Sequence, residues 1–125
     1  MNKIFNVWGR DFNLQIVFDC YKGETVSKEQ NDALRLFVEN PQLINDAKDA
    51  VIAYCIENNR AEIGSDKIEN IFKYVIPQSI YIQRAPDNVH TVGLMCAYKF
   101  NPDDGLAVVF KSEKFFKVGT QNIII

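Results

Sequence analysis

Histidine and long apolar runs are scarce in this chain of 125 residues, and each shortage excludes a class of function. One histidine and three widely separated cysteines do not provide the closely spaced ligands of a structural zinc site. No apolar run approaches the ~20 residues of a transmembrane helix, and the N-terminus lacks the apolar core of a signal peptide. The net charge of −2, without a Lys/Arg-rich run, disfavours a nucleic-acid or membrane partner. We therefore expect a cytoplasmic protein without cofactor or metal.

The three cysteines, Cys20, Cys55 and Cys96, are odd in number, and each lies among apolar residues. Buried free cysteines behave as small hydrophobes, and disulfides are rare in cytosolic proteins. We expect all three to be reduced thiols with a structural role.

Residues 1–125 have the usual length of a single domain, and their pattern divides them into three blocks. Residues 3–20 predict a β-hairpin, because two apolar stretches flank a Gly-Arg-Asp turn. Residues 27–76 show helical periodicity. Residues 79–125 return to a period of two, with a turn expected at residues 85–88.

The helical block opens with a capping box, in which Ser27 caps the helix and Gln30 reaches back. Apolar residues at helical spacing predict a helix that ends at Asn40-Pro41, then a more buried second helix, and a short third helix over residues 66–76. Phe37 and Val51 each lie at the centre of an apolar stripe. We expect these two residues to anchor the core between helices and sheet.

The C-terminal block predicts strands over residues 89–100, 106–111 and 114–118, with a further edge strand over 121–125. Strands and helices are segregated along the chain rather than alternating, which is typical of the α+β class. The expected fold is an antiparallel β-meander sheet with an N-terminal hairpin and a central block of two to three helices packed on one face.

The final segment, Asn122 to Ile125, ends on three apolar isoleucines and lacks the charges that usually protect an edge strand. Two outcomes are open for this segment. It is either tucked against the core of its own chain, which we favour, or paired across a homodimer interface.

Few residues are candidates for catalysis. His90 is the only histidine, and the sequence shows no nucleophile beside it. Asp103 and Asp104 supply oxygen ligands close together, but their loop lacks the length and the distal Glu of an EF-hand. The segment from Asn101 to Gly105 is better interpreted as a β-turn, with glycine at a position of positive φ.

Two surface features favour protein binding. Tyr81, Tyr98 and one of Phe115 and Phe116 are expected on the outer face of the sheet, where exposed aromatic side chains mark an interaction surface. Between Glu24 and Glu62 the chain has eight acidic and four basic residues. This acidity indicates either a solvated helix face or a surface that attracts a basic partner.

Several segments also carry a family resemblance. They are Trp8-Gly9, V-S-K-E-Q-N-D-A-L-R-L-F at residues 26–37, G-L-M-C-A-Y at 93–98, D-D-G-L-A-V-V-F at 103–110 and K-V-G at 117–119. The chain resembles a family of small, uncharacterised bacterial domains of unknown function over nearly its whole length. Some members of that family resemble immunity-type proteins of polymorphic toxin systems. The resemblance implies a bacterial α+β domain that binds another protein.

The chain departs from that family at its main motif. The family has a Trp-Asp-acid-His-Gly-Leu turn between two late strands, and this chain has Phe100 at the start of the turn and Asp104 in place of the histidine. The acid that follows the Val-Gly pair is also missing. The turn itself is retained in this chain. Any chemistry that the family's histidine and acid perform is not expected here.

From these observations we expect a non-enzymatic protein-interaction domain, an immunity or accessory protein that binds a protein partner. The alternative is a small-ligand-binding or hydrolytic domain with a pocket near Asp103, Asp104 and His90. The residues proposed for binding are Tyr81, Tyr98, Asp103 and Asp104.

Overall fold

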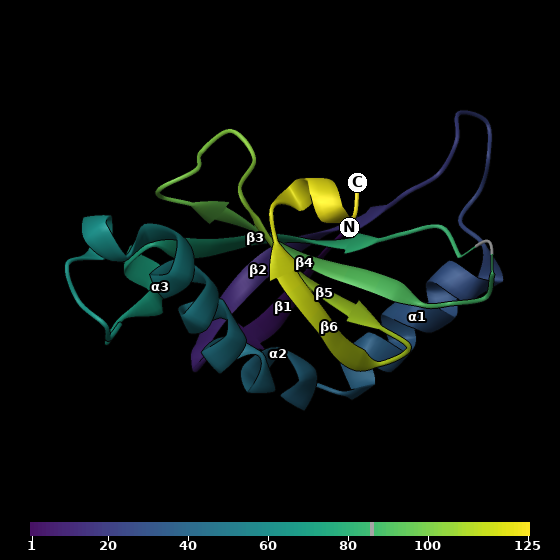
Figure 1. Cartoon of the computed structure of the whole chain (residues 1–125). Helices are drawn as coiled ribbons and strands as arrows, with labels where there is room; N and C mark the ends of the chain where they lie inside the picture. The colour runs from purple at the N-terminus through teal and green to yellow at the C-terminus, as the bar shows by residue number, and fades with distance from the viewer. Residues whose placement is uncertain (86) are drawn as a thin grey trace.

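The computed structural model describes residues 1–85 and 87–125, so Pro86, within the turn expected at 85–88, lies outside the described residues. Two long helices and one short helix stand between the second and third strands (Figure 1). The strands are β1 (Asn2–Val7), β2 (Arg10–Phe18), β3 (Val75–Ile82), β4 (Thr91–Tyr98), β5 (Leu106–Lys111) and β6 (Lys114–Gly119). The helices are α1 (Lys28–Glu39), α2 (Gln42–Asp46) and α3 (Lys48–Ile63), with 3-10 turns η1 (Ile71–Lys73) and η2 (Gln121–Ile123).

All six strands form one sheet in the order β1-β2-β3-β4-β5-β6. The hairpin β1–β2 and the meander β3–β6 are antiparallel, in agreement with the α+β prediction. The two parts are joined by a parallel pair, because β2 lies beside β3 with Phe18 opposite Ile82. The expectation of an antiparallel sheet is corrected to a mixed one. The helical block serves as the long crossover that a parallel connection requires.

The helices cover one face of the sheet and enclose the main core (Figure 1). Helix α1 begins with the predicted capping box, since Ser27 Oγ accepts from Gln30 N at 3.1 Å and Gln30 Oε1 accepts from Ser27 N at 3.1 Å. Phe37 and Val51 are both buried in this core, as their central positions in the apolar stripes predict. The prediction that these residues anchor the layer between helices and sheet is confirmed in position.

The expected helix over residues 66–76 is wrong. This segment contains only the single turn η1, where Asn70 Oδ1 accepts from Phe72 N at 3.1 Å, and Val75 already belongs to β3. Pairing with β4 explains the difference, because Val75 lies opposite Tyr98 in the antiparallel ladder of β3 and β4. A short run of apolar residues fits either structure locally, and the neighbouring strand decides between them.

The other face of the sheet is covered at its centre by the C-terminal segment (Figure 1). Ile124 is 3% exposed and packs with Met95, Ala107 and Val109. The expected edge strand is a 3-10 turn instead, and the segment is tucked against its own chain. Gly93 leaves the space for this contact, because a Cβ built on it would lie 2.8 Å from Ile124 Cδ1. The small residues Gly93 and Ala107 therefore leave a notch in this face of the sheet, which Ile124 fills.

Replacing Ile124 with alanine should lower the free energy of unfolding by about 2 kcal/mol, the low end for a buried isoleucine, because a chain end can relax around the cavity. The matched control is Ile125→Ala, since Ile125 is 65% exposed. Urea unfolding measures the free energy of unfolding, and light scattering measures whether the protein is a monomer. A monomer of unchanged stability in Ile124→Ala would contradict the placement of this segment.

None of the helices in the described part of the chain has the length and apolarity needed to span a bilayer.

Candidate functional site

The described residues form a cleft of about 580 Å³, larger than two other cavities of about 400 and 270 Å³. It is lined by residues of the loop 19–27, by the first turn of α1 and by residues 83–85, and we call it the β2–β3 cleft. Figure 1 shows the loop 19–27 at the upper right, leading into the start of α1.

The position of the β2–β3 cleft follows from the parallel pair. Parallel strands point their carboxyl ends to the same edge of the sheet, so the segments after Phe18 and Ile82 leave together. Asp19 N still donates to Ile82 O at 2.9 Å, after which the two segments separate. The crevice outside the carboxyl ends of parallel strands is the usual ligand position in open α/β sheets. Among the described residues, β2 and β3 form the one parallel pair.

Gln30 forms the base of the β2–β3 cleft. Its buried amide Nε2 donates to Asp19 O at 2.8 Å and to Ile82 O at 3.2 Å, while its Oε1 accepts from Ser27 N. One capping side chain thus joins the ends of both parallel strands to the start of α1. Because each polar atom of a buried amide needs a partner, this network fixes the shape of the base.

Cys20 also lies at this base, with its Sγ 3.9 Å from Gln30 Oε1. It is half-buried, whereas Cys55 and Cys96 are fully buried. Burial raises the pKa of the Cys55 and Cys96 thiols, which keeps them protonated. The expectation of three structural thiols therefore fits Cys55 and Cys96, while Cys20 lines a cavity.

Arg84 forms one wall of the cleft. Its guanidinium carbon lies 3.5 Å from the centre of the Tyr21 ring, and its Nε lies 3.3 Å from Asp19 Oδ2. The contact with Tyr21 is the main cause of a raised pKa at Arg84, and Asp19 adds to it. The guanidinium is therefore already engaged by a carboxylate and an aromatic ring of the same chain.

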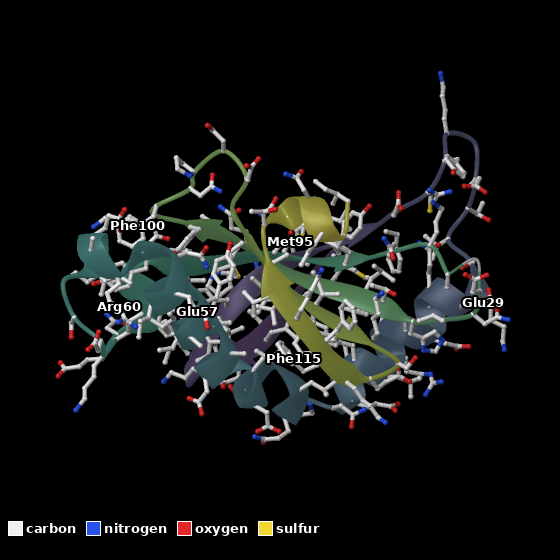
Figure 2. The ribbon with its side chains drawn as sticks, viewed as in Figure 1. Glu29, Glu57, Arg60, Met95, Phe100 and Phe115 are labelled. Carbon is white, nitrogen blue, oxygen red and sulfur yellow. The ribbon has the colours of Figure 1, made fainter. Side chains whose placement is uncertain are left out.

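Two further carboxylates give the cleft a negative balance. Glu24 Oε1 accepts from Tyr21 N at 2.6 Å, and Glu29 stands on the first turn of α1 at the right edge of Figure 2. Neither has a cationic partner within salt-bridge distance in the part of the chain that the structure describes. With Asp19 and Arg84 cancelling, the lining carries an excess of two negative charges.

The acidic block of helices is only partly available to a partner. Helix α1 carries three surface ion pairs with N···O distances of 3.5 to 3.7 Å, which join Lys28 to Asp32, Asp32 to Arg35, and Arg35 to Glu39. Such exposed pairs contribute little to stability, but they neutralise that face of the helix. The acidity predicted from the sequence is therefore least compensated at the β2–β3 cleft and on α3.

The residues of the alternative site do not meet. Asp103 and Asp104 are exposed in the turn between β4 and β5, where Asn101 Oδ1 accepts from Asp104 N at 3.2 Å. His90 lies at the opposite end of β4, with Nδ1 3.2 Å from Glu113 Oε2. None of the three lines any of the cavities described above. Among residues 1–85 and 87–125 there is also no group of three His, Cys, Asp or Glu side chains placed to hold a metal.

The two candidate tyrosines lie on opposite faces of the sheet. Tyr98 is buried on the face covered by the helices, where its hydroxyl donates to Asn59 Oδ1 at 2.6 Å, so its expected outer position is corrected. The alternation along β4 places it with Leu94 and Cys96. Tyr81 is half-buried on the other face, near Asp19. Burial, followed by the charge of Asp19, raises its pKa.

Comparison with known families agrees with one part of the resemblance noted in the sequence, an uncharacterised family of unknown function. No curated protein and no solved structure matches the chain. One family model matches residues 1–125. Because that match spans the whole chain, the protein belongs to the family described as a domain of unknown function, DUF6985.

Proposed function

We propose that this chain is a non-enzymatic protein-interaction domain that binds a basic segment of a partner protein in the β2–β3 cleft. The observation that carries the proposal is a cavity of about 580 Å³ whose lining includes Glu24 and Glu29, neither of which has a cationic partner among the described residues. A concave surface with a few convergent polar groups is the usual form of a binding site.

The lining suits the side chain of arginine or lysine in particular. Tyr21 is 62% exposed and lines the cleft together with the two carboxylates, so the side of its ring that Arg84 does not cover offers an aromatic face near negative charge. Such a face attracts cations. Arg84 illustrates the geometry, because its guanidinium lies over Tyr21 and against Asp19. Complementary charge would also speed association with a basic partner.

An immunity or accessory role is part of this proposal. The family resemblance implies a bacterial protein that masks a protein partner, and an acidic cleft suits a partner with a basic surface. Cytoplasmic localisation is also proposed, supported by thiols that are free in the structure.

A small-ligand-binding or hydrolytic domain is the second candidate. Because Asp103 and Asp104 lie far from His90, they do not form the expected pocket. The ligand site of this candidate is therefore proposed in the β2–β3 cleft. The cleft volume lies within the ~300–1,000 Å³ typical of small-molecule sites. A small cation such as arginine amide is the ligand that the acidic lining would accept.

Binding of labelled peptides tests the proposal. The probes are a flexible Gly/Ser peptide with three arginines, the same peptide with three glutamates, and arginine amide as competitor. We expect the arginine peptide to bind and the glutamate peptide not to bind. Glu24→Gln with Glu29→Gln should weaken binding at least fivefold, because both uncompensated charges are removed.

Asp49→Asn with Glu57→Gln on α3 is the matched control, since it removes the same net charge from exposed positions of another element. This control should change the affinity less than twofold. Equal losses in both double variants would show that net charge alone attracts the peptide and would exclude the cleft. If arginine amide displaces the arginine peptide at a concentration equal to that of the peptide, the small-ligand-binding domain is favoured over the protein-interaction domain.

A further inference from the structure

Strand β6 forms an open edge of the sheet. It pairs with β5 on one side and ends the strand order, and in the part of the chain that is described no strand lies on its other side. Figure 1 shows β6 at the front with α3 to its left, and α3 is the helix that approaches this strand most closely. The first four residues of β6, 114–117, remain exposed. The outer backbone groups of an edge strand are free to pair with another chain.

The side chains of β6 make this edge unusual. Phe115 and Phe116 are 44% and 49% exposed, although both are large aromatic residues (Figure 2 labels Phe115). Phe115 lies opposite Phe110 and Lys117 opposite Val109, so Phe116 is the extra residue of a bulge. Phe115 makes an edge-to-face contact with Phe110, with ring centres 6.3 Å apart. Phe116 remains at the surface.

Three exposed lysines surround the aromatic pair. Lys111 Nζ lies 4.2 Å and Lys117 Nζ lies 5.7 Å from the centre of the Phe116 ring, and Lys114 opens the strand. The acidic residue of the adjoining turn, Glu113, faces His90 at 3.2 Å. The edge is therefore cationic, in a chain whose net charge is −2.

These charges decide what can pair with the edge. A second copy is disfavoured, because antiparallel pairing of two β6 strands about Phe115 and Phe116 would set Lys114 opposite Lys117. Like charges directly opposite each other destabilise a sheet. Lysines and a bulge often serve only to protect an edge, but protection does not require two exposed aromatic side chains.

We propose that β6 binds an extended segment of a partner protein with alternating acidic and apolar residues, which adds a strand to the sheet. Main-chain hydrogen bonds would hold the segment, its carboxylates would meet the three lysines, and its apolar side chains would cover Phe116. This mode of recognition uses backbone pairing for affinity and side chains for specificity. It is independent of the β2–β3 cleft.

Fluorescence anisotropy with a labelled ten-residue peptide of alternating Glu and Val tests the inference, with a Lys and Val peptide as the comparison. We expect the acidic peptide to bind and Lys114→Glu with Lys117→Glu to weaken it at least tenfold. The same variant should bind the basic peptide more tightly than the wild type does. Lys3→Glu on the opposite edge, β1, is the matched control and should change neither affinity by more than twofold.

Four results would overturn the inference. The first is no binding of the acidic peptide to the wild type at millimolar concentration, with the fold intact by circular dichroism. The second is an equal loss of binding in Lys3→Glu. The third is a wild-type dimer that dissociates in the Lys114→Glu, Lys117→Glu variant, which would make a second copy the occupant. The fourth is tighter binding of a ten-nucleotide single strand than of the acidic peptide, which would indicate a nucleic acid.

Discussion

Replacing Phe37 with alanine is expected to lower the free energy of unfolding by about 3–5 kcal/mol, the range for a fully buried phenylalanine. Phe37 is 3% exposed and lies between Phe5 and Phe110, with ring centres 6.2 and 5.2 Å away. It thus joins helix α1 to β1, at one end of the sheet order, and to β5, the neighbour of the other end, because each of these strands supplies one of its partners. Urea unfolding followed by circular dichroism measures the loss.

The matched control is Phe116→Ala, which removes the same atoms from an exposed position. Its effect on stability should stay within about 0.5 kcal/mol, as for most surface substitutions. A urea midpoint for Phe37→Ala that equals the wild-type value would show that Phe37 does not anchor the core.

Gly105→Val is the second substitution with a large expected effect, a loss of about 2–5 kcal/mol from two additive causes. Gly105 has a φ of +61°, and the left-handed region costs an L-residue roughly 1–2 kcal/mol. A Cβ at this position would also lie 2.8 Å from the carbonyl oxygen of Cys96 and 2.6 Å from Gln121 Nε2. Forcing atoms into such a packed site typically costs about 1–3 kcal/mol more.

Two control variants separate these causes. Gly64 has a φ of +76°, and an added Cβ would have no atom within 4 Å. Gly64→Val should therefore lower the free energy of unfolding only by the cost of the left-handed backbone, about 1–2 kcal/mol. Asp103→Asn with Asp104→Asn should leave thermal stability nearly unchanged, because neither carboxylate makes a hydrogen bond in the described structure. Equal losses for Gly105→Val and Gly64→Val would rule out the steric cause. A calcium-dependent rise in melting temperature that the double variant abolishes would instead indicate a metal site at the turn.

Local patterns predicted the elements whose causes are local. The capping box at Ser27 and Gln30 and the apolar stripe through Phe37 lie within one segment, and the structure confirms both. The strand Leu106–Lys111 has the predicted bounds, because turn residues border it on both sides.

The wrong predictions concern segments whose structure depends on distant partners. Val75 and its neighbours pair with β4 instead of closing a helix. Ile124 fills a notch between Gly93 and Ala107 instead of extending a strand. Nothing near these residues in the sequence reveals which partner they find, so propensity alone gave a reasonable but incorrect element.

The β2–β3 cleft was missed for the same reason. It exists because β2 and β3 pair in parallel across the helical block, and this brings Asp19 and Tyr21 to Arg84, 65 and 63 positions along the chain. One signal was present in the sequence, since Gln30 is an unusual polar member of an apolar stripe. Its buried amide is the group that ties the two strand ends together.

A chemical-shift map of the backbone amides during titration with the arginine peptide tests the central claim most directly, because it locates binding without a variant. If the chain binds basic segments in the β2–β3 cleft, the largest shifts will fall in residues 19–30 and 83–85, and they will decrease as salt is raised. Shifts that are absent at saturating peptide, or that gather on the exposed acids of α3, would contradict the proposed function.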